Sequence, residues 1–325
     1  MLKVLPDTSR ILWILALIVL IAAPSTGAEG PQQEDAQIFA ILRASDAPLL
    51  VSAVRDGDVE AVRSLLRQGA DANAAEGDGF SSLHWAAKSG APEIAKVLLD
   101  AGATVDVKTR NGAYTPLHEA SKAGNALVAR VLLEAGADSA ARTTTGEVTP
   151  LHFAAISGSA AAVEVLLESG VDIDAREGES EQTPLTWAAA GNHLETVNAL
   201  VDGGADLNAA TKVVDMVKAF ADIRKARELY EKRQESGETE SDERPDLFDE
   251  PEEAVVQSGP RVLTFADLVS KKGGLTPLLL AARQGHRDVV MRLLDGGADI
   301  NHQAAEGSSP LLIATINGHF DLGLE

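Results

Sequence analysis

The chain has 325 residues, of which 49 are acidic and 28 basic, so its net charge at pH 7 is -21. This acidic excess argues against nucleic acid and anionic membrane surfaces as partners, because both are bound through clustered Lys and Arg. The absence of cysteine excludes disulfides, thiolate metal sites and a cysteine nucleophile. With 28 Gly and only 4% aromatic residues, the composition favours close packing of small residues over an aromatic-rich core.

The first 28 residues have the features of a signal peptide. Lys3 and Arg10 provide a short basic start, and thirteen uncharged, mostly apolar residues (11–23) lead to small residues that end at Ala28. This apolar stretch is shorter than the roughly 20 residues that span a bilayer, and its length is typical of a signal peptide. We therefore expect cleavage near Ala28, with membrane contact only during export. An uncleaved N-terminal membrane anchor is the alternative.

The mature product is predicted to be periplasmic or secreted. No Asn in the sequence lies in an Asn-x-Ser/Thr acceptor for glycosylation. Together with the lack of cysteine, this favours export in a bacterium over a eukaryotic secretory route. Residues 29–48 would then form an N-terminal cap or linker, with a short helix over residues 32–44.

A single repeat period organises the rest of the chain. Leucines at the start of Thr-Pro-Leu-like segments follow one another at sequence intervals of 33, 34, 34, 34, 93 and 33. These leucines define repeats 1 to 7, and they are Leu50, Leu83, Leu117, Leu151, Leu185, Leu278 and Leu311. The long interval, between repeats 5 and 6, indicates an insertion.

Each repeat is predicted to be a pair of helices. Seven residues after each leucine stands a Gly, or Asn192 in repeat 5, where a left-handed residue must end the first helix. A second helix then ends on a Leu-Leu pair or a similar apolar pair, followed by another Gly three residues later. Thr-Pro at the start of repeats 3 to 6 supplies an N-cap hydroxyl and a proline at the first helical position.

Strings such as YTPLHEASKAGNALVARVLLEAGAD and SSLHWAAKSGAPEIAKVLLDAGATVD resemble ankyrin repeats. The resemblance covers about residues 49–208 and 274–325, and its recurrence at a fixed period makes it specific. It implies an all-α solenoid of stacked helix pairs, with hairpin-like loops projecting to one side, that binds other proteins. Ser81-Ser82 in place of Thr-Pro, and the start DAPLLVSA in repeat 1, depart from the pattern.

The predicted organisation is repeats 1 to 5 over residues 49–209, an insertion over 210–273, and repeat 6 with a truncated repeat 7 over 274–325. The insertion should open with an amphipathic helix from Val213 to about Glu235, because apolar residues recur there at helical spacing. An acidic segment, 235–253, and a short helix, 262–269, should follow. We expect either a loop packed on its own solenoid or an arm that docks a partner. Since the chain ends inside a predicted second helix, we expect the natural protein to continue.

Two sets of residues could be sites, but both are assigned to structure. His84, His118 and His152 recur at the repeat period, but neighbouring helices about 8 to 10 Å apart cannot bring their rings to one metal ion. Trp85 and its equivalents Phe153 and Trp187 align with Leu280 and Ile313, which indicates a core position. No nucleophile elbow or phosphate-binding loop is present. We therefore predict no catalytic residue, no cofactor and no metal.

The predicted function is a non-enzymatic scaffold, monomeric, that binds a still unidentified protein partner. In such folds the variable surface positions lie three residues before the repeat leucine and five or six after it. Exposed aromatic and basic residues there are typical of protein interfaces. The candidate partner-binding residues are Phe80, Tyr114, Val148, Gln182 and Leu275 on the loops, and Lys88, Lys122, Ile156 and Arg283 on the first helices. Two alternatives are an architectural envelope spacer and the binding module of an enzyme whose catalytic domain lies beyond residue 325.

Overall fold

The computed structural model describes residues 49–236 and 271–323. The predicted signal peptide, N-terminal cap, most of the acidic segment and the helix over 262–269 lie outside these residues. Residues 49–55 are helical. The further elements are α3 (Val59–Arg67), α4 (Ser82–Ser89), α5 (Pro92–Asp100), α6 (Pro116–Lys122), α7 (Ala126–Glu134), α8 (Pro150–Ser157), α9 (Ala160–Glu168), α10 (Pro184–Ala190), α11 (Leu194–Asp202), β1 (Val214–Asp215), α12 (Met216–Ser236), β2 (Lys271–Lys272), α14 (Pro277–Gln284), α15 (Arg287–Asp295), α16 (Pro310–Ile316) and the 3-10 helix η1 (Phe320–Gly323).

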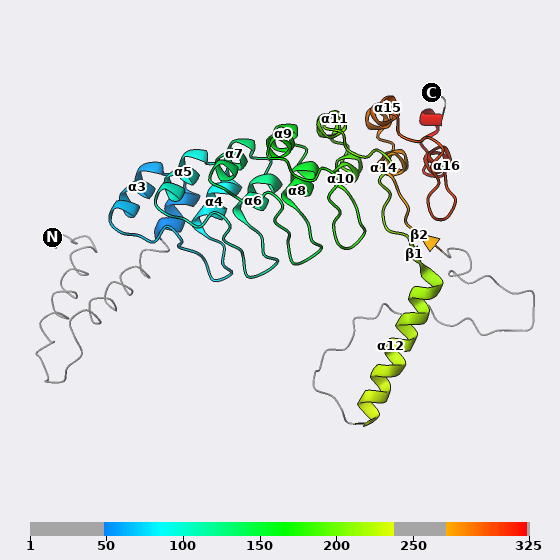
Figure 1. Cartoon of the computed structure of the whole chain (residues 1–325), viewed down its shortest axis with the longest axis horizontal. Coiled ribbons are helices and arrows are strands. Elements are labelled where there is room, and N and C mark those ends of the chain that lie inside the picture. Colours follow the sequence, from blue (N-terminus) through cyan, green and yellow to red (C-terminus); the bar gives the residue numbers. More distant parts are fainter. Residues whose placement is uncertain (1–48, 237–270, 324–325) are drawn as a thin grey trace, which may run out of the picture. The chain divides into compact units, whose positions relative to one another are not determined.

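The repeats stack as two parallel rows of helices (Figure 1). The first helices α4, α6, α8, α10, α14 and α16 each contact the next in order, and the second helices α3, α5, α7, α9, α11 and α15 form the other row. The repeat leucines of the inner repeats are almost wholly buried between these rows. A helix of this short length is marginal alone, so it is the stacked neighbours that stabilise each pair. This arrangement confirms the predicted all-α solenoid.

Left-handed residues end the first helices, as predicted. All seven positions found from the sequence, six Gly and Asn192, have φ between 58° and 84°. After two of these turns the next residue reaches back to the preceding repeat: the Asn125 Nδ2 donates to the carbonyl of Ala87 at 2.8 Å, and the Ser159 Oγ donates to that of Gly124 at 3.0 Å. The turns therefore shape each repeat and also connect it to its neighbour.

The three histidines that recur at the repeat period are structural. This confirms the role that their spacing predicted. Each is fully buried, and its Nε2 lies 3.0 to 3.2 Å from a carbonyl of the next loop. Each Nδ1 lies 2.8 to 2.9 Å from the N-cap hydroxyl of its own helix, which belongs to Ser81, Thr115 or Thr149. Because a carbonyl only accepts, Nε2 carries the proton, and because Nδ1 accepts from the backbone amide of Ser81, Thr115 or Thr149, it carries none and the ring is neutral.

The loops between repeats form two-stranded fingers joined by a backbone ladder. The amide of one finger donates to a carbonyl near the tip of the preceding finger, with distances of 2.8 to 3.0 Å. The donor and acceptor pairs are Arg110 to Asp78, Thr144 to Gly112, Gly178 to Gly146, Lys212 to Ser180, and Ala305 to Gly273. The first four acceptors recur at the repeat period, so the next would be residue 214. It is instead Gly273, which places the insertion at the tip of one finger.

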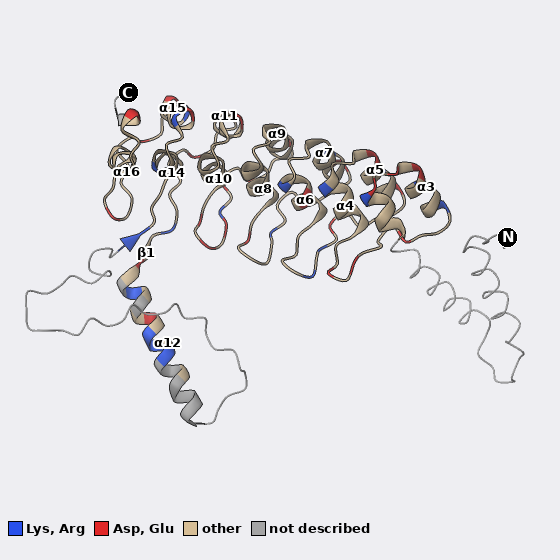
Figure 2. Cartoon of the chain, turned by 180° about the vertical axis from the view of Figure 1, so that it is seen from behind, with Lys and Arg blue, Asp and Glu red and all other residues tan. Residues whose placement is uncertain are grey.

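The insertion leaves and re-enters this finger through a short antiparallel pair. Val214 pairs with Lys272 and Asp215 with Lys271. The helix predicted from Val213 begins at Met216, because the residues before it are extended in β1. Figure 2 shows Lys and Arg along α12. On either side of the insertion the array is continuous, since α10 contacts α14 and α11 contacts α15.

Candidate protein-binding surface

Five aromatic rings form a ridge over the first helices. We define the aromatic ridge as Phe80 and Tyr114 on the fingers with Trp85, Phe153 and Trp187 on α4, α8 and α10. Every ring is half-buried. Their centroids lie 4.9 Å apart for Phe80 and Trp85, 5.7 Å for Tyr114 and Phe153, and 6.2 Å for Phe153 and Trp187. Such contacts contribute about 0.5 to 1.5 kcal/mol each beyond burial, so the rings hold one another in place.

The prediction that Trp85, Phe153 and Trp187 are core residues is therefore wrong in part. Trp85 and Trp187 pack against the core, yet all three rings keep exposed surface and contact the finger aromatics or one another. Helix geometry explains the difference. The residue two after the repeat leucine points between core and fingers, so a small aliphatic side chain is covered there whereas a large ring extends beyond the core.

Cationic side chains lie over the ridge. The Lys88 Nζ is 5.0 Å from the Trp85 ring centroid and 5.7 Å from that of Phe80, and the Lys122 Nζ is 5.8 Å from that of Tyr114. The Arg55 Cζ lies 4.5 Å from the Trp85 centroid. Each cation is within the range at which an aromatic face attracts it, an effect of about 0.5 to 1 kcal/mol at exposed sites. The ridge is thus an ordered surface of rings and cations.

The predicted partner-binding residues differ in their exposure and in their contacts with the ridge. It joins Phe80 with Lys88 and Tyr114 with Lys122, as above. Gln182 is half-buried, and its backbone carbonyl accepts from the His152 Nε2. Arg283 is exposed on α14, and among the described residues it takes part in no ring contact of the ridge. Of the other loop and helix positions, Val148 is buried and Ile156 is exposed.

Sequence reasoning missed Arg55 and Glu119. Arg55 stands five residues after Leu50, the position of Lys88 and Lys122 in their repeats, so the repeat register could have identified it even though repeat 1 lacks the Thr-Pro-Leu-His start. Glu119 stands at the position of Trp85 and Phe153, and its side chain is 8% exposed. A carboxylate within an otherwise apolar row is a signal that the alignment of the repeats could have given.

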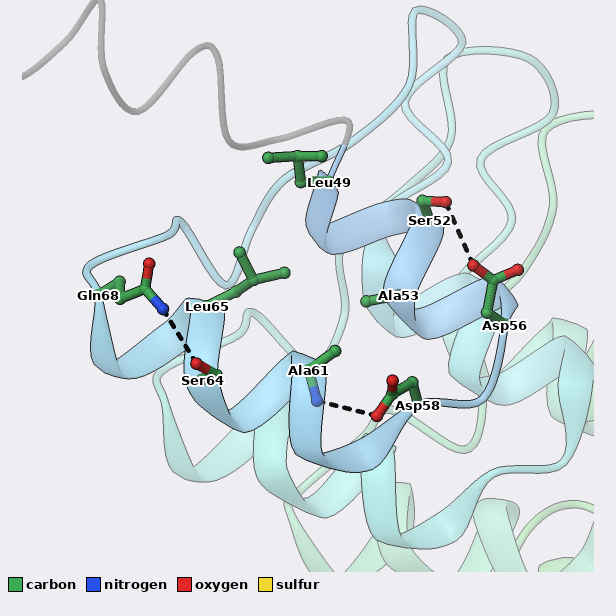
Figure 3. A pocket seen from close by; sticks show the side chains of 9 residues that line it. All are labelled: Leu49, Ser52, Ala53, Asp56, Asp58, Ala61, Ser64, Leu65 and Gln68. Carbon is green, nitrogen blue, oxygen red and sulfur yellow. Dashed lines mark hydrogen bonds between the residues drawn. The ribbon is translucent and has the colours of Figure 1, made fainter. Parts of the chain in front are cut away.

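A cavity of about 430 Å³ lies beside α3 and the preceding helical turn, as Figure 3 shows. Its polar side chains already have local partners. The Ser52 Oγ donates to the Asp56 Oδ2 at 3.4 Å, and the Ala61 amide donates to the Asp58 Oδ1 at 2.9 Å. The cavity therefore lacks converging polar groups that would fix a small ligand.

Within residues 49–236 and 271–323, no three His, Asp or Glu side chains are arranged to hold a metal ion. In the same part of the chain no helix has both the length and the apolar character needed to cross a bilayer. The aromatic ridge is thus the described surface whose chemistry is typical of a binding site.

Stacked helix pairs, left-handed turns and a row of fingers define the class of helical repeat proteins. A family model described as ankyrin repeats (3 copies) matches residues 50–143, 139–211 and 256–323, so the chain belongs to the ankyrin-repeat family. Ankyrin repeats form protein–protein interaction scaffolds, and the fold is generally a non-catalytic interaction module.

Two similar proteins place the chain among known structures and sequences. The ankyrin repeat domain of human ASB11 superposes with a TM-score of 0.58 at 27% identity, over 82% of this chain and 90% of that one. The 2-5A-dependent ribonuclease of Mus musculus is 44% identical over 69 residues, which are 21% of this chain. The match spans only 9% of the ribonuclease's length.

Proposed function

We propose that the chain is a non-enzymatic scaffold that binds a partner protein through the aromatic ridge and its cations. The observation that carries the proposal is the row of half-buried rings with Lys88, Lys122 and Arg55 over their faces. Aromatic residues and Arg are enriched at the centres of protein interfaces, and the lysines add charge to the same surface. Because the rings already hold one another, binding would cost little side-chain entropy. Gln182 and Arg283 would contribute at the edge of the contact.

Site-specific photocrosslinking tests this proposal. A photoreactive phenylalanine analogue at Tyr114 should crosslink to a partner protein in cells that make the full chain. The same analogue at Leu127, which is 70% exposed on α7, is the matched control and should not. Lys122→Ala should reduce the crosslink from position 114. Equal capture at the two positions, or no capture at either, would contradict a partner site on the ridge.

We also propose that the scaffold is exported, on the basis of the N-terminal sequence alone. The short apolar stretch and the small residues after it support cleavage near Ala28. Sequencing of the mature protein should find its N-terminus near Glu29, in the periplasm or the medium. An intact Met1 on a membrane-bound product would support the anchored alternative. The ribonuclease activity named for the mouse relative is not part of the proposal, since the match covers only 9% of that protein's length.

A further inference from the structure

We propose, building on the scaffold function above, that the ridge recognises an acidic peptide segment of the partner, in extended form, whose carboxylates pair with Lys88 and Lys122. This deepens the proposed function by naming the chemistry of the partner. It rests on the charge state of the ridge, on the spacing of its lysines and on the rings beneath them.

Lys88 and Lys122 have no acidic partner, whereas several arginines of the array are paired with a carboxylate. Arg63, Arg130 and Arg292 on the second helices pair with Glu93, Glu168 and Asp202. Two finger arginines are paired as well, Arg142 with Glu147 and Arg176 with Glu181. In the described part of the chain, neither Lys88 nor Lys122 has a carboxylate within 4.0 Å.

In a chain of net charge -21, two lysines without a carboxylate partner on one surface mark a place where a carboxylate from outside can bind. The chain's overall field opposes this only weakly at physiological salt, because charges more than about 8 Å apart are largely screened. The local charge of the ridge therefore decides which partner it attracts.

The lysine spacing fits an extended chain. Lys88 and Lys122 occupy equivalent positions on α4 and α6, which pack as neighbours. Packed helices lie about 8 to 10 Å apart. Three residues of polyproline II chain rise about 9 Å and bring the side chains back to one face. Acidic residues three apart would therefore meet successive lysines.

The rings supply the apolar part of the contact. Phe80 and Trp85 lie beside Lys88, and Tyr114 lies beside Lys122. Proline or leucine between the acidic residues would rest on these rings, while the lysine stems cover their edges. A purely acidic chain would leave the rings unused, so the expected segment alternates acidic and apolar residues.

Glu119 allows a test that distinguishes an acidic ligand from a basic one. It lies on α6 three residues before Lys122, at the position that Trp85 takes on α4, and its carboxylate makes no ion pair with any described residue. Its negative charge would repel an acidic ligand and attract a cationic one. Glu119→Gln should therefore strengthen acidic peptide binding by about two- to fivefold, the scale of one partly screened charge. The same variant should weaken binding if the true ligand is basic.

The experiment uses the full chain and a fluorescent 12-residue peptide with Glu at every third position and Pro and Leu between. Its Gln and Lys analogues are the controls for charge. The Glu peptide should bind, with affinity falling as salt is raised, and the two analogues should bind at least tenfold more weakly. Trp85 fluorescence gives a second readout at the site.

Two double variants locate the contact. Lys88→Gln with Lys122→Gln should weaken binding about tenfold, from the loss of two charge contacts. Lys96→Gln with Lys108→Gln removes two exposed lysines elsewhere on the array and should change the affinity for the Glu peptide less than twofold.

The proposal is overturned if the Gln or Lys analogue binds as well as the Glu peptide, or if the two double variants weaken binding equally. It is also overturned if carbodiimide links Lys88 to the chain's own acidic segment, 235–253, in place of the peptide. If the peptides fail while photocrosslinking at Tyr114 still captures a partner, the scaffold function stands and the acidic specificity falls.

Discussion

Glycine in the turns of this protein has two separate roles that only the structure distinguishes. In one role, Gly adopts a positive φ, a backbone conformation that is strained for any residue with a Cβ. In the other, Gly leaves room for a neighbouring side chain that a Cβ would contact. At Gly158, with φ 76°, a Cβ would lie 2.6 Å from the His193 Nδ1, whereas at Gly136, with φ 87°, it would meet nothing within 4 Å. The sequence places Gly158 after a first helix and Gly136 after a second helix, but it does not show which of the two lacks space for a Cβ.

Gly158→Ala should therefore destabilise the protein more than Gly136→Ala. We expect a loss of about 1 kcal/mol for Gly136→Ala from backbone strain alone. Gly158→Ala should cost about 2 to 3 kcal/mol, since the His193 ring must also move. Urea unfolding followed by circular dichroism measures both. Equal losses would show that the His193 ring yields freely and that space is no constraint there.

At the scale of the helix, the buried histidines tie each first helix to the next finger, and this makes stability depend on pH. Burial lowers the pKa of His118 and of His152 to about 4, and it lowers that of His84. The folded protein thus holds neutral rings at a pH where the unfolded chain binds protons. Their contribution is complete above about pH 6.5 and is lost as pH falls toward 4.

Repeat 5 offers a natural comparison for testing this, because Thr186 takes the histidine position. Its hydroxyl lies 3.0 Å from the Thr183 Oγ1 and caps the helix without a titrating group. His152→Thr should lower stability at pH 7.5 by about 1 to 3 kcal/mol, from the lost bond to the carbonyl of Gln182. As the pH falls from 6.5 to 5.5, the difference in the free energy of unfolding between this variant and the natural protein should narrow by about 1 kcal/mol. Urea midpoints across this range measure it, and a constant gap would contradict the lowered pKa.

Elements of this fold differ in how far the sequence predicts them. The left-handed turns, the Thr-Pro helix starts and the histidine bonds recur with the period, so each repeat confirms the others. The aromatic ridge could not be predicted in this way, because equivalent positions in the repeats behave differently there. Trp85 and Leu280 share a position, yet the ring extends toward the fingers and the aliphatic chain is covered, because side-chain size decides what the core can enclose. Glu119 was missed because it departs from the aromatic or aliphatic residues at its position, whereas Arg55 stands at the same repeat position as Lys88 and Lys122 and was overlooked because repeat 1 lacks the motif's start.

At the scale of the whole molecule, the insertion interrupts the sequence without interrupting the stack. The long interval from Leu185 to Leu278 spans helices that still pack as neighbours, α10 with α14 and α11 with α15. Finger contacts continue on both sides. The Thr211 amide donates to the carbonyl of Leu275, and the Leu275 amide donates to the Thr211 Oγ1. Residues up to Lys212 therefore belong to the repeat, which the sequence alone could not locate.

This register defines an excision that should leave the array folded. Deleting residues 214–272 and joining Val213 to Gly273 shortens the interval between Leu185 and Leu278 to that of the uninterrupted repeats. The ladder bonds from Lys212 to Ser180 and from Ala305 to Gly273 are retained. Because a long loop adds only slowly to the entropy of closure, we expect the free energy of unfolding to change by about 1 kcal/mol or less.

A second deletion, of residues 211–272, is the matched control for that excision. It also removes Thr211, Lys212 and Val213, so the interval becomes shorter than the repeat period and the Thr211 bonds that close the finger are lost. We expect it to lose about 2 kcal/mol or more, since buried backbone groups lose their partners.

Urea unfolding measures the stability of both deletion variants. If both deletions unfold the array, α12 contributes to the stability of the stack. If the first deletion keeps both stability and peptide binding, the contact surface lies in the repeats and not in the insertion.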